Sequence, residues 1–134
     1  MTHALARPKV LVVDDSATSC LTLEGHLKDA YEVHVAPNGQ AGVQRALAVK
    51  PDLIIMDVMM PVMDGHTACR LLREHMDTAA TPIIMVTSRD DEWDVEAGWV
   101  SGCTDYVIKP ADREELLAKI ESWLDVSRPV SDAP

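Results

Sequence analysis

The sequence predicts an α/β fold in which the five strands of a parallel sheet alternate with five helices through right-handed crossovers. Short strand-like runs alternate along the chain with longer segments whose apolar residues have helical spacing. Three of the short runs are apolar throughout, which is typical of strands buried on both faces of a parallel sheet. Residues that favour turns and helix caps separate these segments.

The first two segments are a buried strand and the helix that follows it. Residues 9–13 form a β-branched apolar run, which predicts a strand. Ser16 can then cap a helix that reaches residue 27. The apolar positions of this helix have helical spacing, and they are Ala17, Cys20, Leu21, Leu23 and Leu27.

The next three segments are an edge strand, a helix and a central strand. Residues 31–35 alternate apolar with polar, which predicts a strand with one face in water at the edge of the sheet. Asn38 can cap a helix that runs to about Val49, where Pro51 stops it. Residues 52–57 form another apolar run and predict a central strand.

The second half of the chain continues the alternation. A helix is predicted from about 66 to 75. One of its faces carries Cys69, Leu72 and Met76. Residues 82–87 form the third continuous apolar strand, and a helix over 90–100 and a strand over 105–108 follow.

The last helix has the clearest pattern. Asp112, with Glu115 three residues later, forms a capping-box pattern. The apolar residues of this helix recur at helical spacing, and they are Leu116, Leu117, Ile120, Trp123 and Leu124. We expect a flexible segment over 1–7, one domain over 8–126 and a disordered tail over 127–134.

Composition excludes several classes of protein. The formal net charge of -10 argues against direct binding to nucleic acid, which depends on basic residues that neutralise phosphates. No apolar run approaches the roughly 18 residues of a membrane span. The cysteines are odd in number and widely spaced, which suits buried thiols in a reducing cytoplasm. They are Cys20, Cys69 and Cys103, and none has the spacing of a zinc site.

Polar side chains follow four of the predicted strands at their carboxyl ends, where open parallel sheets bind ligands. They are Asp14, Asp15, Asp57, Thr87, Ser88 and Lys109. Taken singly, each has an ordinary explanation, because acids after strands often cap helices, threonines there are usually structural, and lysines are usually solvated. Their coincidence at one edge of the sheet favours a functional site.

The three acids at this edge predict a site for Mg²⁺. Crowded carboxylates repel one another unless a cation joins them, and hard oxygen ligands are the ones that Mg²⁺ takes. A carboxylate poised by a metal can act as a nucleophile in phosphoryl transfer. Lys109 would then balance the charge of a bound phosphoryl group, and the Thr87 hydroxyl could donate a hydrogen bond to it.

Four motifs stand at these strand ends. They are Val12-Val13-Asp14-Asp15-Ser16, Met56-Asp57-Val58-Met59-Met60-Pro61-Val62-Met63-Asp64-Gly65, Thr87-Ser88 and Tyr106-Val107-Ile108-Lys109-Pro110. In this order and at this spacing they resemble the receiver domain of two-component response regulators, including the single-domain chemotaxis type. The resemblance covers about 8–126 and implies a flavodoxin-like, doubly wound sheet of strand order 2-1-3-4-5, with the strand 31–35 at an edge.

The resemblance implies that Asp57 accepts a phosphoryl group from a phosphohistidine on a histidine kinase or a phosphotransfer protein. Asp15 and Asp57 would bind Mg²⁺ directly, together with the backbone carbonyl of Met59. Asp14 would act mainly through water. Mg²⁺ is therefore the expected cofactor.

The resemblance also assigns the residues that respond to the phosphoryl group. Thr87, Ser88 and Lys109 would hold its oxygens, and the Lys109–Pro110 bond would be cis. Tyr106 would be the switch, turning inward when Thr87 moves toward the phosphate. Such a protein catalyses only its own phosphorylation and dephosphorylation.

The resemblance implies roles for two further sets of residues, from their positions in the family pattern. Met59 and Arg89 would form a rim that tunes the access of water, and we predict that this apolar and cationic pair slows hydrolysis of the phosphoaspartate. Trp93, Val100 and Tyr106 would lie on the face made by the helix 90–100, the strand 105–108 and the last helix. A downstream protein would bind there, or two copies would dimerise on phosphorylation.

Three other functions are compatible with parts of this pattern. A phosphatase with an aspartate nucleophile would need a second acid at the position of Met59. A flavodoxin-like cofactor binder would want hydroxyls in place of Asp14 and Asp15. A pseudo-receiver that is not phosphorylated would lack one of the acids. We therefore expect a phosphorylation-controlled switch.

Overall fold

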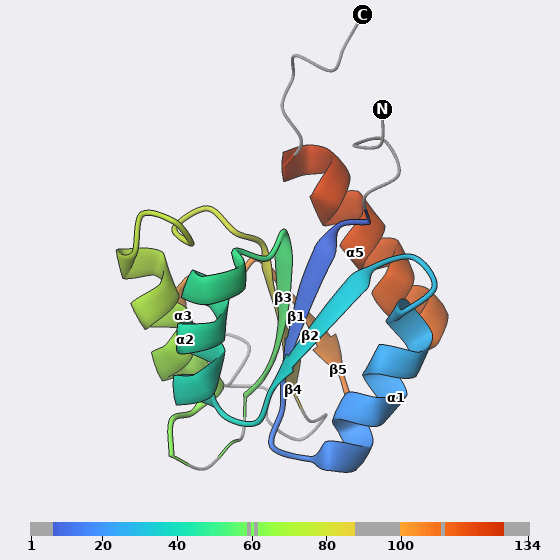
Figure 1. Ribbon diagram of the computed structural model, residues 1–134, viewed down its shortest axis with the longest axis horizontal. Coiled ribbons are helices and arrows are strands. Elements are labelled where there is room, and N and C mark those ends of the chain that lie inside the picture. The colour runs from blue at the N-terminus through green and yellow to red at the C-terminus, as the bar shows by residue number, and fades with distance from the viewer. Residues whose placement is uncertain (1–6, 59, 61, 88–99, 111, 128–134) are drawn as a thin grey trace, which may run out of the picture.

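A five-stranded parallel sheet forms the centre of the computed structural model, which describes residues 7–58, 60, 62–87, 100–110 and 112–127 (Figure 1). The strands are β1 (Lys9–Val13), β2 (Glu32–Ala36), β3 (Leu53–Asp57), β4 (Ile83–Thr87) and β5 (Asp105–Ile108). Their order is β2-β1-β3-β4-β5, and every neighbouring pair is parallel. The predicted fold class, the strand order and the edge position of β2 are therefore confirmed.

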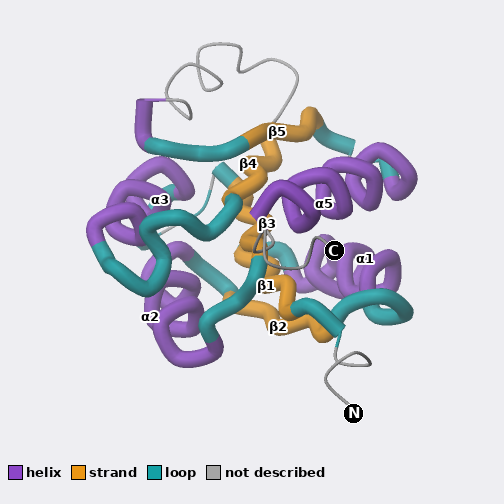
Figure 2. Tube along the Cα trace, turned by 90° about the horizontal axis from the view of Figure 1, so that it is seen from above, coloured by secondary structure: helices purple, strands orange, loops and turns teal. Residues whose placement is uncertain are grey.

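Helices cover both faces of the sheet. The described helices are α1 (Ala17–Leu27), α2 (Gly39–Val49), α3 (Gly65–Glu74) and α5 (Arg113–Ser127). Helices α2 and α3 lie on one face, and α1 and α5 lie on the other (Figure 2). The helix predicted over 90–100 falls outside the described residues except for Val100. None of the described helices has the length and apolar character needed to cross a membrane.

Alternate residues of the central strands fill two cores, one on each face of the sheet. Towards α2 and α3, the buried strand residues are Leu11, Val13, Ile54, Met56, Ile83 and Met85. Towards α1 and α5, they are Val10, Val12, Leu53, Ile55, Ile84 and Val86. The three apolar runs are thus strands covered on both faces, as the sequence predicts.

Side-chain caps fix the residues at which the helices begin. Ser16 and Asn38 each accept a hydrogen bond from the backbone N–H three residues later, at 3.2 Å and 2.8 Å. The Asp112 carboxylate accepts one from the N–H of Glu115 at 3.0 Å. These three predicted caps are confirmed. Helix α5 ends at Ser127, one residue beyond the domain boundary that the sequence predicts.

Three residues at apolar positions of predicted helices are exposed, and they are Ala17, Leu21 and Met76. Leu21 is 69% exposed because it follows the buried Cys20 by one residue, which is about 100° around a helix. Met76 is 93% exposed because α3 ends before it. The backbone of His75 is extended, so helical spacing no longer applies after that residue.

Candidate functional site

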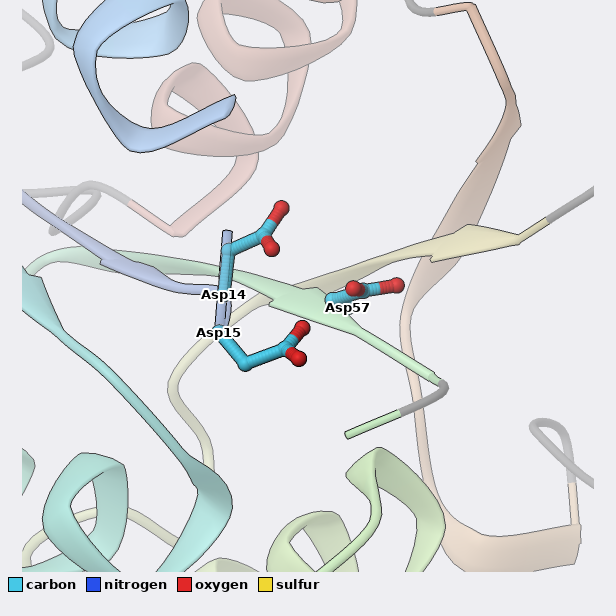
Figure 3. A group of neighbouring side chains, drawn as sticks. All are labelled: Asp14, Asp15 and Asp57. Atoms are coloured by element: carbon cyan, nitrogen blue, oxygen red, sulfur yellow. The ribbon is translucent and has the colours of Figure 1, made fainter. Parts of the chain in front are cut away.

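The ends of β1 and β3 bring three carboxylates together (Figure 3). Asp14 and Asp15 follow β1 directly, and Asp57 is the last residue of β3, which pairs with β1. Each residue offers one carboxylate oxygen, and these oxygens all lie within 4.8 Å of one another. Asp14 and Asp57 are buried, whereas Asp15 is exposed. The structure therefore gathers the three acids that the sequence singles out.

The ammonium group of Lys109 lies against this cluster. Its Nζ is 3.1 Å from Oδ1 of Asp57. One ammonium group beside three carboxylates leaves an excess of negative charge, which is costly when two of the acids are buried. A divalent cation would relieve this excess, and carboxylate oxygens are the ligands that Mg²⁺ prefers. The donor set fits Mg²⁺.

Asp14 is held in place at the turn that leads from β1 into α1. Its Oδ1 accepts a hydrogen bond from the backbone N–H of Ser16 at 2.9 Å, and its carbonyl oxygen accepts one from the Cys20 thiol at 3.3 Å. Burial raises the pKa of Cys20, and nearby carboxylates, above all Asp14, raise it further. Nothing in the sequence marks this contact, because a cysteine at an apolar helix position is equally expected in a core.

The hydroxyl of Thr87 is buried at the end of β4. Thr87 is 3% exposed, and within the described part of the chain its Oγ1 has no hydrogen-bond partner. A buried hydroxyl without a partner costs about 1–3 kcal/mol. Thr87 neighbours Lys109 across the β4–β5 pair, so the hydroxyl and the ammonium group belong to adjacent strand ends.

Several predicted site residues lie outside the described residues, and they are Met59, Ser88, Arg89 and Trp93. Their roles stay predictions. Val100 is 85% exposed, and Tyr106 is half-buried against the core beneath α2 and α3. The peptide bond between Lys109 and Pro110 is cis, as the resemblance implies.

A cavity of about 440 Å³ lies beside the acid cluster, between α1 and the turn after β5. Its polar lining includes Asp14, Thr18, Thr22 and Lys109. No pattern in the sequence predicts this cavity. The spacing of Thr18 and Thr22, four residues apart, places them on one face of α1, but polar residues on a helix surface are too common to indicate a cavity.

The family described as the response regulator receiver domain matches residues 10–121. The protein PilH of Pseudomonas aeruginosa is 41% identical over 117 residues, which cover 87% of this chain and 97% of PilH. The response regulator ArlR of Staphylococcus saprophyticus is 38% identical over 117 residues, which cover 87% of this chain and 52% of ArlR. The chain therefore spans nearly all of PilH and about half the length of ArlR.

A solved structure supports the same comparison. The receiver domain of the sensor histidine kinase PA1611 from Pseudomonas aeruginosa aligns with a TM-score of 0.84 and 30% sequence identity. The alignment covers 90% of this chain and 99% of that chain. That receiver domain has a magnesium ion coordinated in its active site cleft.

Proposed function

The chain belongs to the family of response regulator receiver domains, and we propose on this basis that its Asp57 carboxylate accepts a phosphoryl group from a phosphohistidine. The donor is a histidine kinase or a histidine phosphotransfer protein. Receiver domains are signalling switches and not enzymes that act on a separate substrate. The only reactions that we assign to this chain are its own phosphorylation and dephosphorylation. The phosphatase, cofactor-binding and pseudo-receiver alternatives have no support in the comparisons.

One observation carries the proposal, which is the contact between the Lys109 ammonium group and an Asp57 carboxylate that two further acids surround. Mg²⁺ is the cofactor that this donor set fits. Asp15 and Asp57 would bind it directly, Asp14 through water, and the carbonyl of Met59 would be a further ligand. When bound, Mg²⁺ neutralises the carboxylates and attracts the phosphoryl oxygens.

The chain's own residues account for the transfer step. A carboxylate oxygen of Asp57 forms a bond to phosphorus as the bond from phosphorus to the donor's imidazole nitrogen breaks, and the imidazole leaves with the electron pair. Lys109 is close enough to Asp57 to donate a hydrogen bond to a transferred phosphoryl oxygen. The hydroxyl of Thr87 donates to another oxygen, together with Ser88. This assignment gives the buried Thr87 hydroxyl a partner.

The output of the switch passes through a protein partner. Contact of Thr87 with the phosphoryl group biases a pre-existing equilibrium between two states, and Tyr106 turns inward in the phosphorylated state. The partner, or a second copy of the chain, binds the face that carries Val100, Tyr106 and Trp93. Exposed apolar side chains at Val100 and Ile108 support this assignment.

The cavity between α1 and the turn after β5 is where the donor protein would bind. Its lining includes Asp14 and Lys109, which contacts Asp57, so a partner seated there would bring its phosphohistidine close to Asp57. We place the protein in the cytoplasm, because its three cysteines are buried and free, as expected in a reducing compartment.

Intact mass spectrometry tests the proposed function. The wild type and Asp57→Asn are incubated with acetyl phosphate, with and without Mg²⁺. We expect the wild type alone to gain one phosphoryl group, and only with Mg²⁺. If the wild type binds Mg²⁺ but gains no mass, the chain is a receiver that signals without phosphorylation.

A further inference from the structure

Two helices begin against the segment that follows Asp57, each with a glycine at the contact. Gly39 is the first residue of α2, and a Cβ atom there would overlap the carbonyl oxygen of Met63. Gly65 is the first residue of α3, and a Cβ atom there would overlap the carbonyl oxygen of Asp57 and lie 3.0 Å from Cα of Val58. These neighbours are backbone atoms, so they cannot rotate away as a side chain can.

Backbone contacts connect these glycines to Asp57 in a continuous path. Met63 is partly buried and packs against the core beneath α2 and α3. Asp64, the next residue, caps α3 with its side chain. The N–H of Gly65 then donates to the carbonyl oxygen of Val58 at 2.9 Å. A displacement of Met63 would therefore also displace Gly65 and, through it, the peptide that follows Asp57.

The same segment contains strained backbone at Val62. Its φ is 72°, although it is a β-branched residue, and its side chain is 77% exposed. A left-handed conformation costs an L-residue about 1–2 kcal/mol, and an exposed side chain has little packing to offset that cost. Such strain persists only where neighbouring residues hold the backbone in place. Met63, against which Gly39 packs, is the next residue along the chain.

We propose that Gly39 is a positioning residue for phosphoryl transfer. The absence of a Cβ atom lets the start of α2 approach Met63, and this contact, passed on through Gly65, keeps the Asp57 carboxylate beside Asp14 and Asp15. The inference rests on the proposed function of Asp57. Changing residues that orient metal ligands typically weakens metal binding by about 10–100-fold.

Two glycine-to-alanine variants test the proposal. Gly39→Ala is expected to bind Mg²⁺ about tenfold more weakly by titration calorimetry, and to be phosphorylated more slowly by acetyl phosphate. Gly25→Ala, with open space around the new atom, should change neither property.

A second pair of variants perturbs the path without adding an atom to α2. Met63→Ala removes the packing that holds the segment after Asp57, whereas Val43→Ala removes a partly buried side chain of α2 from the same core. Only Met63→Ala should weaken Mg²⁺ binding. The proposal is overturned if Gly39→Ala binds Mg²⁺ as tightly as Gly25→Ala does. If Gly39→Ala does not fold, the proposal is overturned when Met63→Ala binds Mg²⁺ as tightly as Val43→Ala does. A wild type that neither binds Mg²⁺ nor gains a phosphoryl group would refute the proposed function instead.

Discussion

The backbone N–H of Lys109 donates a 2.7 Å hydrogen bond to the carbonyl oxygen of Thr87. This bond joins the chain at the carboxyl ends of β4 and β5, so the ammonium group and the hydroxyl belong to neighbouring backbone segments. Lys109 contacts the Asp57 carboxylate, whereas the buried hydroxyl of Thr87 has no partner among the described residues. One donor carries charge and the other does not. Their contributions can therefore be separated by substitution.

Lys109→Gln should have opposite effects on metal binding and on phosphoryl transfer. Mg²⁺ binding should become tighter, because a positive charge next to the site is lost. Phosphorylation by acetyl phosphate should become slower by about 10²–10³-fold, because a donor to the developing charge is removed. Calorimetry and a mass time course measure the two effects. Lys28→Gln, an exposed lysine, controls for net charge, and a wild-type rate in Lys109→Gln would exclude the assigned role.

Thr87→Val should leave the unphosphorylated protein as stable as the wild type, or stabilise it by up to about 1 kcal/mol. The reason is that valine matches threonine in shape and removes a buried hydroxyl that has no partner among the described residues. Phosphorylation should nevertheless slow by about tenfold, because a donor to the phosphoryl oxygens is lost. Urea denaturation and the mass time course measure the two properties. Thr87→Ser should keep the wild-type rate, and a destabilised Thr87→Val would show that the hydroxyl has a partner in the folded chain.

The fold could be predicted from the sequence because the strands of a parallel sheet have a recognisable local pattern of apolar residues. Strands buried on both faces are apolar throughout, and β2, which alternates, lies at the edge. The buried face of a helix is harder to predict. Helical spacing identifies apolar positions, but which of them face the sheet depends on packing, so Leu21 is exposed beside the buried Cys20.

The acids of the site could be predicted because each follows a strand directly. The proximity of Asp14 and Asp57 follows from the rule that neighbouring parallel strands end at the same edge of the sheet. The contacts of Gly39 with Met63 and of the Cys20 thiol with Asp14 could not be predicted. They depend on how closely a helix approaches a loop or turn in space, and no pattern of residue types indicates that distance.

Val62→Asn should stabilise the protein by about 1 kcal/mol, because asparagine adopts the left-handed conformation more readily than valine does. Little packing is lost, since the valine side chain is 77% exposed. Urea denaturation measures the change in the free energy of unfolding. Val62→Ala keeps a Cβ atom at the unfavourable φ and should therefore stabilise less than Val62→Asn. If Val62→Asn were less stable than the wild type, the valine side chain would have to contribute packing.

Asp105 joins β5 to α5. Its carboxylate accepts hydrogen bonds from Nζ of Lys119 at 3.1 Å and 3.2 Å, and from the indole N–H of Trp123 at 2.8 Å. Burial by itself raises the pKa of Asp105, but the hydrogen bonds from Trp123, the Tyr106 N–H and Lys119, with the charge of Lys119, outweigh burial and lower the pKa below its ordinary value.

This lowered pKa predicts how stability depends on pH. The ionised Asp105 stabilises the folded chain above the pKa of an unfolded aspartate, about 4, and this contribution is lost as pH falls through the lower folded-state pKa. Asp105→Asn should therefore cost about 1–2 kcal/mol at neutral pH. The difference from the wild type should shrink at pH below about 4. Urea denaturation over a pH series measures it, and a difference that is constant with pH would contradict the assignment.

Thr22→Trp should distinguish phosphorylation by a protein donor from phosphorylation by a small-molecule donor. Thr22 is exposed on α1 and lines the same cavity as Asp14 and Lys109, so an indole ring there would occupy the space proposed for the donor protein. Acetyl phosphate is small enough to reach Asp57 without that space. We therefore expect phosphorylation from a phosphotransfer protein that is active on the wild type to fall at least about tenfold, and the acetyl phosphate reaction to stay unchanged.

Lys28→Trp is the control, because Lys28 is exposed at the end of the same helix and lines neither this cavity nor the pocket between α1 and Pro37. It should be phosphorylated normally by both donors. If Thr22→Trp slowed both donors equally, the new ring would be disturbing Asp57 itself. If it slowed neither, the cavity beside α1 would have no part in transfer.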